Sequence, residues 1–185
     1  MGHKIKYMTK NSALVFKFLE VVVWIIFVGL CIETGALVVN FVYSLFNPLA
    51  LKNLYNKLDL SDLYQRKQYL FFLFYGFILS ISLLKAFLFY EVIKLIGKLD
   101  LQMPFSVFVS NQISQIRTLT FTIGLLSIIA TRVVNNFSKK GFEVSQLNEY
   151  WTDGKAFILM SAVLFIIATI FKRGIELQSE NDLTV

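Results

Sequence analysis

Four long apolar segments constrain this chain more than any other feature of its sequence. They cover about residues 13–46, 69–97, 118–137 and 156–171. An α-helix needs roughly 20 such residues to cross the hydrocarbon core of a bilayer. Soluble domains have about 45–50% apolar and about 25% charged residues, whereas this chain has 56% and 16%. The sequence therefore predicts an all-α membrane protein, a bundle of four transmembrane helices forming a single domain over residues 1–185.

The first apolar segment superficially resembles a secretory signal peptide, because several lysines precede it. The apolar region of a signal peptide has about 7–15 residues and ends at a small-residue cleavage site. The segment at 13–46 is longer than that, and no Ala-x-Ala site follows it. We therefore expect it to be a retained helix.

Two shorter segments have the spacing of amphipathic helices. After Asn47 and Pro48, which can cap and start a helix, the apolar residues Leu51, Leu54, Tyr55 and Leu58 alternate with polar ones. The second segment follows Pro104, and its apolar residues recur three or four positions apart, namely Phe105, Phe108, Val109, Ile113 and Ile116. Both predict short interfacial helices at the membrane surface, and the second leads into the third span.

The orientation of the bundle depends on where the basic residues lie. With the N-terminus inside, nine basic residues fall on the inner side and eight on the outer side. This near balance does not decide the topology. The first helix usually dominates orientation, and its lysine-rich N-terminal flank favours the inside, as does Lys172-Arg173 after the last span. We therefore expect both termini to be cytoplasmic, with a polar C-terminal tail at residues 174–185.

Ionisable residues at hydrocarbon depth are the candidate site residues. Each costs roughly 2.5–3.5 kcal/mol at a helix centre, so it usually has a partner or a function. Counting the helical rise from each midpoint places Glu33 of the first span level with Arg132 of the third. The same count places Glu20 within about one turn of Lys85. The sequence thus predicts the intramembrane pairs Glu33–Arg132 and Glu20–Lys85. Glu91 is expected to be solvated at the inner interface.

These charges allow two interpretations. They either lock the helices together, or they line an ion or proton path or a polar ligand pocket. Transporters typically show helices broken by Gly or Pro in matching halves, and no proline falls inside a span here. The only histidine, His3, lies in the N-terminal tail, and no catalytic or phosphate-binding motif is present. We therefore expect no enzyme activity, no catalytic residue, no cofactor and no metal site.

The charge of the chain does not indicate nucleic-acid binding. Its formal net charge is +6, but the Lys and Arg residues are spread among the apolar segments and form no basic block. That distribution is typical of interfacial anchors that contact membrane lipids.

Several segments resemble a family of bacterial membrane proteins known as domain of unknown function 2975. The resemblance rests on the order of four apolar helices, Pro104-Phe105-Ser106, the run 113–117 and the C-terminal sequence IFKRGIELQSENDLTV at 170–185. It covers nearly the whole chain. The family has no established activity, and the resemblance implies an association with a small helix-turn-helix regulator.

The sequence favours a non-enzymatic regulatory or interaction protein in a bacterial inner membrane, acting with a cytoplasmic partner. The acidic residues Glu176, Glu180 and Asp182 could meet a basic domain of that partner. The alternative is a small oligomeric transporter or channel subunit, because four spans leave little room for an internal pathway. A continuous polar cavity reaching Glu33 and Arg132 would favour transport, and a dry seam would favour partner binding.

Overall fold

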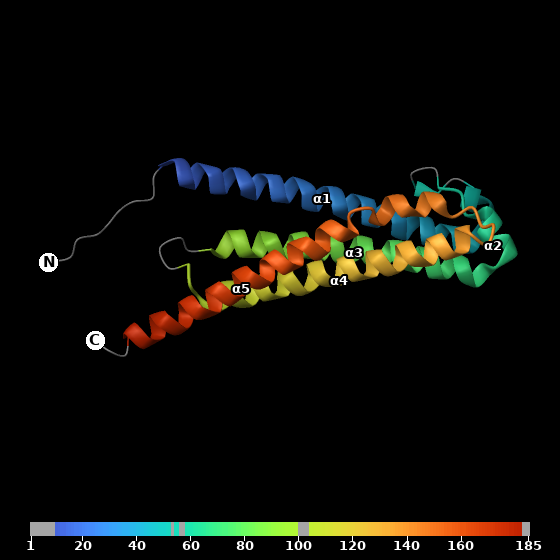
Figure 1. Ribbon diagram of the computed structural model, residues 1–185. Helices are drawn as coiled ribbons and strands as arrows, with labels where there is room; N and C mark the ends of the chain where they lie inside the picture. The colour runs from blue at the N-terminus through green and yellow to red at the C-terminus, as the bar shows by residue number, and fades with distance from the viewer. Residues whose placement is uncertain (1–9, 53, 56–57, 100–103, 183–185) are drawn as a thin grey trace.

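The computed structural model describes residues 10–52, 54–55, 58–99 and 104–182, and the described part is all-α. Four long helices run alongside one another: α1 (Lys10–Phe46), α3 (Gln68–Lys98), α4 (Val107–Ser138) and α5 (Gly154–Asp182). Short helices η1 (Pro48–Lys52), α2 (Ser61–Arg66) and η3 (Ser145–Trp151) lie at one end of the bundle, and the start of α1 and the end of α5 lie at the other (Figure 1). The predicted four-helix membrane bundle is confirmed, since all four helices are long and apolar enough to span a bilayer.

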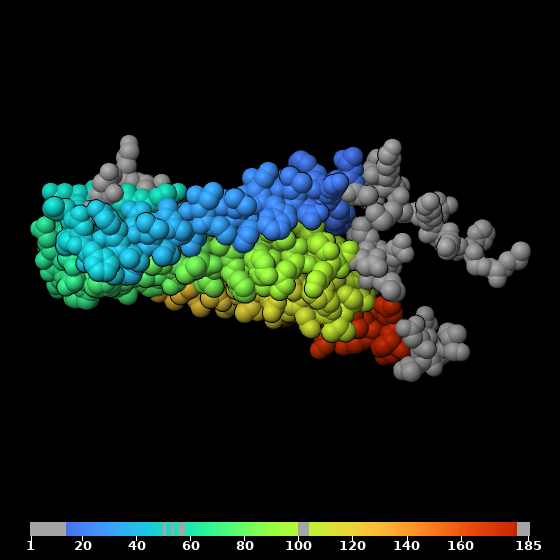
Figure 2. Space-filling view, turned by 180° about the vertical axis from the view of Figure 1, so that it is seen from behind, coloured from blue at the N-terminus to red at the C-terminus, as the bar shows by residue number. Residues whose placement is uncertain are grey.

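The long helices follow one another in a row. Extensive contacts join α1 to α3, α3 to α4 and α4 to α5, and Figure 2 shows α1, α3 and α4 side by side on one face. Large apolar side chains are exposed along α1, including Phe18, Ile25 and Val39. Lipid tails tolerate such exposure, because they are as apolar as the side chains themselves.

The end of the bundle with the short helices holds the best-packed core. Trp151, Tyr75, Phe71 and Phe74 are fully buried there, together with leucines of the connection between α1 and α3, namely Leu51, Leu54, Leu58, Leu60 and Leu63. The predicted surface helix over Leu51–Leu58 is therefore wrong in detail. Pro48–Lys52 forms a short 3-10 helix there, and Leu51, Leu54 and Leu58 are buried in the protein core.

Local hydrogen bonds fix where the short helices begin. Leu49 N donates to Asn47 Oδ1 at 3.2 Å, as expected for a cap before Pro48. Ser61 N and Ser61 Oγ both donate to Asp59 Oδ1, at 2.9 and 2.7 Å, at the start of α2. These two bonds lower the pKa of the Asp59 carboxyl below its ordinary value of 3.8, because they stabilise its charged form.

The second predicted interfacial helix is the first part of α4 and not a separate element. Ser106 caps α4 by accepting a hydrogen bond from Val109 N. Val109 and Ile113 are buried with Ala168 of α5, so the apolar face packs against protein and the helix runs on unbroken. The last helix is likewise longer than the predicted span 156–171, since α5 continues through the polar tail to Asp182.

Small residues set the closest approach between α4 and α5. A Cβ atom at Gly124 would lie 2.8 Å from the Ile158 side chain, and one at Gly154 would lie 2.5 Å from Ser127 Cβ. Membrane helices use small residues in this way to bring their backbones together. The start of α5 therefore lies directly against α4 at Ser127.

Candidate functional site: a polar cluster between α1, α3 and η3

Lys85 of α3 is the centre of a polar cluster inside the bundle. Its side chain is only 18% exposed, and its Nζ lies 2.8 Å from Asp153 Oδ2. The same Nζ donates to the Tyr150 carbonyl oxygen at 3.4 Å and lies 5.6 Å from the centroid of the Phe157 ring. Asp153 immediately precedes α5, and its own carbonyl accepts from Phe157 N. Lys85 therefore joins the connection between α4 and α5 to α3 through polar contacts.

A small cavity lies next to this lysine. It has a volume of about 60 Å³ and is lined by Leu30, Glu33, Ile78, Ile81, Ser82, Lys85 and Tyr150. Tyr150 Oη closes the cluster towards the short helices by donating to the Tyr55 carbonyl oxygen at 3.2 Å. Small-molecule sites are usually about 300–1,000 Å³, so this space suits a few water molecules and excludes a larger ligand.

Hydrogen bonds extend the polar seam along the contact between α1 and α3. The hydroxyl oxygens of Thr34 and Ser82 lie 2.9 Å apart, and both side chains are buried. One turn further, Tyr75 Oη donates to the Leu37 carbonyl oxygen at 3.1 Å. Such interhelical hydrogen bonds stabilise membrane helices against one another.

The structure brings together Glu33 and Lys85, one member of each predicted pair, at the same cavity. The two residues do not pair with the partners that the sequence predicted. Among the described residues, the ion pairs within 4.0 Å include neither Glu33–Arg132 nor Glu20–Lys85. Lys85 pairs with Asp153 instead, and α3 separates α1 from α4 in the row of helices.

Arg132 lies at a different cavity. Its exposed side chain faces the connection between α4 and α5, in a space of about 470 Å³ that shares no lining residue with the cavity at Glu33. This space is lined by Ser127, Ile128, Thr131, Arg132, Asn148, Trp151, Thr152, Gly154 and Lys155. Glu20 is half-buried on α1.

Glu91 corrects a further expectation, because it is not solvated. Its side chain is 3% exposed, and Lys94 Nζ lies 3.0 and 3.2 Å from its two carboxylate oxygens. Gln112 of α4 donates to the Glu91 carboxylate and, at 3.1 Å, to the Glu91 carbonyl oxygen. The i, i+3 spacing of Glu91 and Lys94 was the signal available in the sequence. The sequence contains no comparable signal for Gln112, because this residue falls on the polar side of the amphipathic pattern after Pro104.

The described residues contain no group of three or more His, Cys, Asp or Glu side chains placed to share a metal ion. The polar cluster contains Lys85, whose charge is balanced by Asp153. It also contains the carboxylate of Glu33 and the hydroxyl groups of Ser82 and Tyr150. Its clearest chemical role is to join α1, α3 and the start of α5 through polar contacts.

Four apolar helices with a polar seam between them define a polytopic helical membrane protein. The chain belongs to the family described as protein of unknown function (DUF2975), whose family model matches residues 54–185. The matched region starts after α1, so it covers less of the chain than the sequence resemblance implied. No curated protein and no solved structure shows significant similarity to the chain.

Proposed function

We propose that this protein is a non-enzymatic regulatory or interaction protein of a bacterial cytoplasmic membrane, which acts with a soluble cytoplasmic partner. The observation that carries the proposal is the length of α5. The helix continues from Lys172 to Asp182, beyond its last apolar stretch. Eleven residues at 1.5 Å each make a projection of about 16 Å, and Leu177 on it is 65% exposed.

The base of this projection is held in place by Phe105. The Phe105 ring lies 5.3 Å from the ring of Phe171, centroid to centroid, and a Cβ atom at Gly174 would meet it at 2.5 Å. Phe105 belongs to the segment that precedes α4, so two parts of the chain far apart in sequence meet here. A projection with a fixed direction is a suitable docking element, because less conformational entropy is lost when a partner binds it.

The proposed orientation places this projection in the cytoplasm. The C-terminal ends of α3 and α5 lie at the same end of the bundle (Figure 1). The last part of α3 contains Lys94 and Lys98, and the last part of α5 contains Lys172 and Arg173. Basic residues that flank spans favour the cytoplasmic side. A helix-turn-helix regulator of the kind implied by the family resemblance is the proposed class of partner. Direct binding of nucleic acid by this chain is not proposed.

Site-specific photo-crosslinking in cells tests the partner. A photoreactive residue replaces Leu177 in the full chain, and the same residue replaces Asn136, which is exposed on α4 at the other end of the bundle. We expect a discrete soluble protein to be crosslinked from position 177 and not from position 136. Equal crosslinking patterns from the two positions, or lipid adducts alone, would contradict the proposal.

Cysteine labelling tests the orientation separately. In a Cys31→Ala background, Ser179→Cys should react with a membrane-impermeant maleimide only after lysis, whereas Ser138→Cys should react in spheroplasts. Both serines are exposed. The opposite pattern would place the projection outside the cell and remove the cytoplasmic partner.

The second candidate is a small oligomeric transporter or channel subunit. The carboxylate of Glu33 beside Lys85 favours it, because ionisable groups within spans often mark ion or proton paths. The 60 Å³ volume of that cavity, and its separation from the space at Arg132, support the interaction role instead. Ion flux through purified protein in liposomes that is abolished by Glu33→Gln would favour transport.

A further inference from the structure

Arg117 lies on α4 at the transition from a more polar to a more apolar part of the helix. The residues before it include the polar Ser114 and Gln115, and the predominantly apolar part of the helix follows it. Its guanidinium carbon lies 5.5 Å from the centroid of the Phe165 ring on α5. Within the described part of the chain, no carboxylate forms an ion pair with Arg117 at 4.0 Å or less.

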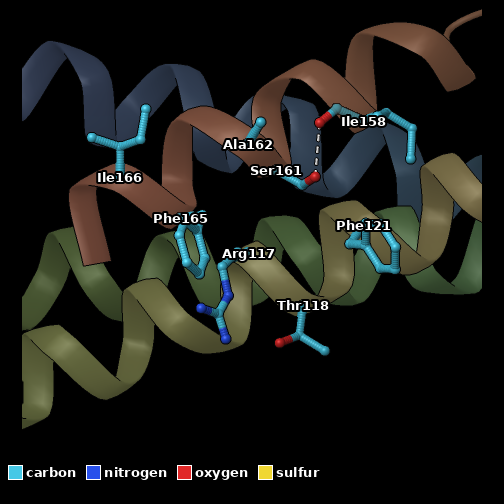
Figure 3. Close-up of a pocket in the computed structure, with 8 residues that line it drawn as sticks. All are labelled: Arg117, Thr118, Phe121, Ile158, Ser161, Ala162, Phe165 and Ile166. Carbon is cyan, nitrogen blue, oxygen red and sulfur yellow. Dashed lines mark hydrogen bonds between the residues drawn. The ribbon is translucent and has the colours of Figure 1, made fainter. Parts of the chain in front are cut away.

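A cleft lies beside this arginine, between α4 and α5. It has a volume of about 640 Å³ and is lined by Arg117, Thr118, Phe121, Ile158, Ser161, Ala162, Phe165 and Ile166. Figure 3 shows Arg117 beside the Phe165 ring, with Phe121 further along α4 and Ile158 and Ala162 on α5. Ser161 Oγ donates to the Ile158 carbonyl oxygen at 2.7 Å, so its hydroxyl is satisfied within the helix and the cleft is mainly apolar.

A second, smaller cleft adjoins the same arginine on the α3 side of α4. It measures about 350 Å³ and is lined by Phe87, Ser114, Gln115, Arg117, Thr118 and Leu119. Arg117 and Thr118 therefore form a ridge between two clefts.

The depth of Arg117 follows from its contact with Phe165 on α5. Phe165 precedes Lys172 by seven residues, or about 10 Å along α5. Lys172 ends the apolar part of α5, and a headgroup layer is about 5–8 Å thick on each side of a bilayer. Arg117 thus lies about 10 Å on the hydrocarbon side of Lys172, where an unneutralised charge is costly. Its long side chain can extend from there towards the headgroup phosphates.

We propose that Arg117 and the cleft between α4 and α5 form a binding site for an anionic phospholipid. The guanidinium would bind the lipid phosphate through charge-assisted hydrogen bonds, and one acyl chain would lie in the cleft over Phe121, Ile158 and Ala162. Charge complementarity selects an anionic lipid, because no carboxylate of the described residues forms an ion pair with Arg117 and the phosphate charge of such a lipid is not already balanced by a cation in its own headgroup. The site is independent of the proposed partner-binding role of α5.

Native mass spectrometry of the purified full chain in detergent tests the charge. The probes are phosphatidylglycerol, phosphatidylcholine and inorganic phosphate. We expect wild-type protein to retain phosphatidylglycerol in preference to phosphatidylcholine. Arg117→Gln should weaken phosphatidylglycerol binding about tenfold, in line with the loss of a charge-assisted hydrogen bond. The matched control Arg173→Gln, at an exposed arginine outside the cleft, should bind as wild type does.

A second pair of variants tests the cleft without changing charge. Ala162→Trp fills the cleft and should weaken phosphatidylglycerol binding to a similar extent. Val163→Trp changes the next residue, which is exposed and does not line the cleft, and should have little effect. This pair keeps the proposal testable even if Arg117→Gln is poorly folded.

Three results would overturn the proposal. Arg117→Gln or Ala162→Trp could bind phosphatidylglycerol as tightly as wild type. Inorganic phosphate could displace the lipid at equal concentration, which would assign the arginine to a free anion. A dimer that forms in place of the lipid adduct and is lost in Ala162→Trp would assign the cleft to a second copy of the chain.

Discussion

Lys85 in the middle of α3 forms an ion pair with Asp153, the residue just before α5, with 2.8 Å between Nζ and Oδ2. The lysine is mostly buried, whereas the Asp153 side chain is 44% exposed. Helices α3 and α5 have few close backbone contacts, because α5 packs mainly on α4, whereas α3 packs on α1 and α4. The pair is therefore a direct electrostatic connection between them.

A double-mutant cycle on Lys85 and Asp153 should reveal this connection. We expect Lys85→Met and Asp153→Asn each to destabilise the protein, and the double variant to lose less than the sum of the two. Partly exposed ion pairs contribute up to about 1 kcal/mol, so the coupling energy should be near that value. Unfolding in detergent with increasing denaturant measures it. Losses that simply add would show that the contact contributes nothing.

The matched control is the pair that the sequence predicted. Glu33→Gln and Arg132→Gln should give additive effects, because the two residues line separate cavities. If the double variant lost less stability than the sum of the two single losses, the result would support the predicted Glu33–Arg132 pair.

The architecture could be predicted from the sequence because lipid imposes a simple rule. A spanning segment must be apolar and must satisfy its own backbone, which leaves a long helix as the solution here. The four segments accordingly fall within the four long helices. The start of α4 and the end of α5 were less predictable. Polar residues before Thr118 belong to α4 and polar residues after Phe171 belong to α5, although they add nothing to the hydropathy of the spans.

The charge pairs were less predictable, for a geometric reason. Helical rise gives the depth of Glu33 and Arg132, but it does not give the order of helices around the bundle. Placing α3 between α1 and α4 separates those two residues. Asp153 lies in a connection, outside the apolar segments whose charges the helical rise can pair. Its position follows from the close packing of Gly154 on Ser127.

Alanine substitutions at Gly124 and Gly76 should have different effects on stability. At Gly124 a new Cβ would lie 2.8 Å from the Ile158 side chain and 2.9 Å from its backbone nitrogen, so Gly124→Ala must push α5 away. Overpacking of this kind costs about 1–3 kcal/mol. At Gly76 nothing lies within 4 Å, so Gly76→Ala should be neutral or stabilising by up to about 1 kcal/mol. Thermal unfolding in detergent distinguishes them, and equal melting temperatures would refute the close approach.

Gln112→Leu should destabilise the contact between α3 and α4. The amide of Gln112 donates to the buried carboxylate of Glu91, and its loss leaves that carboxylate with Lys94. An unsatisfied buried group costs about 1–3 kcal/mol, and more when it is charged. Gln115→Leu is the control, because Gln115 is exposed on the same helix. The same denaturant titration applies, and equal stability of the two variants would show that Gln112 is not needed to satisfy Glu91.

The titration of Asp59 should depend on the hydroxyl of Ser61. The hydrogen bond from Ser61 Oγ lowers the pKa of the Asp59 carboxyl most, and the hydrogen bond from Ser61 N lowers it further. Because the folded pKa is below the unfolded value, the stabilisation from this carboxylate is present above pH 3.8. It is lost as pH falls through the lowered folded pKa. Ser61→Ala should raise the titration midpoint of Asp59 towards 3.8, whereas Ser61→Thr keeps a hydroxyl and should hold it low. Carbon-13 NMR of the Asp59 carboxyl group measures the midpoint, and an unchanged midpoint in Ser61→Ala would exclude the Oγ hydrogen bond as the main cause.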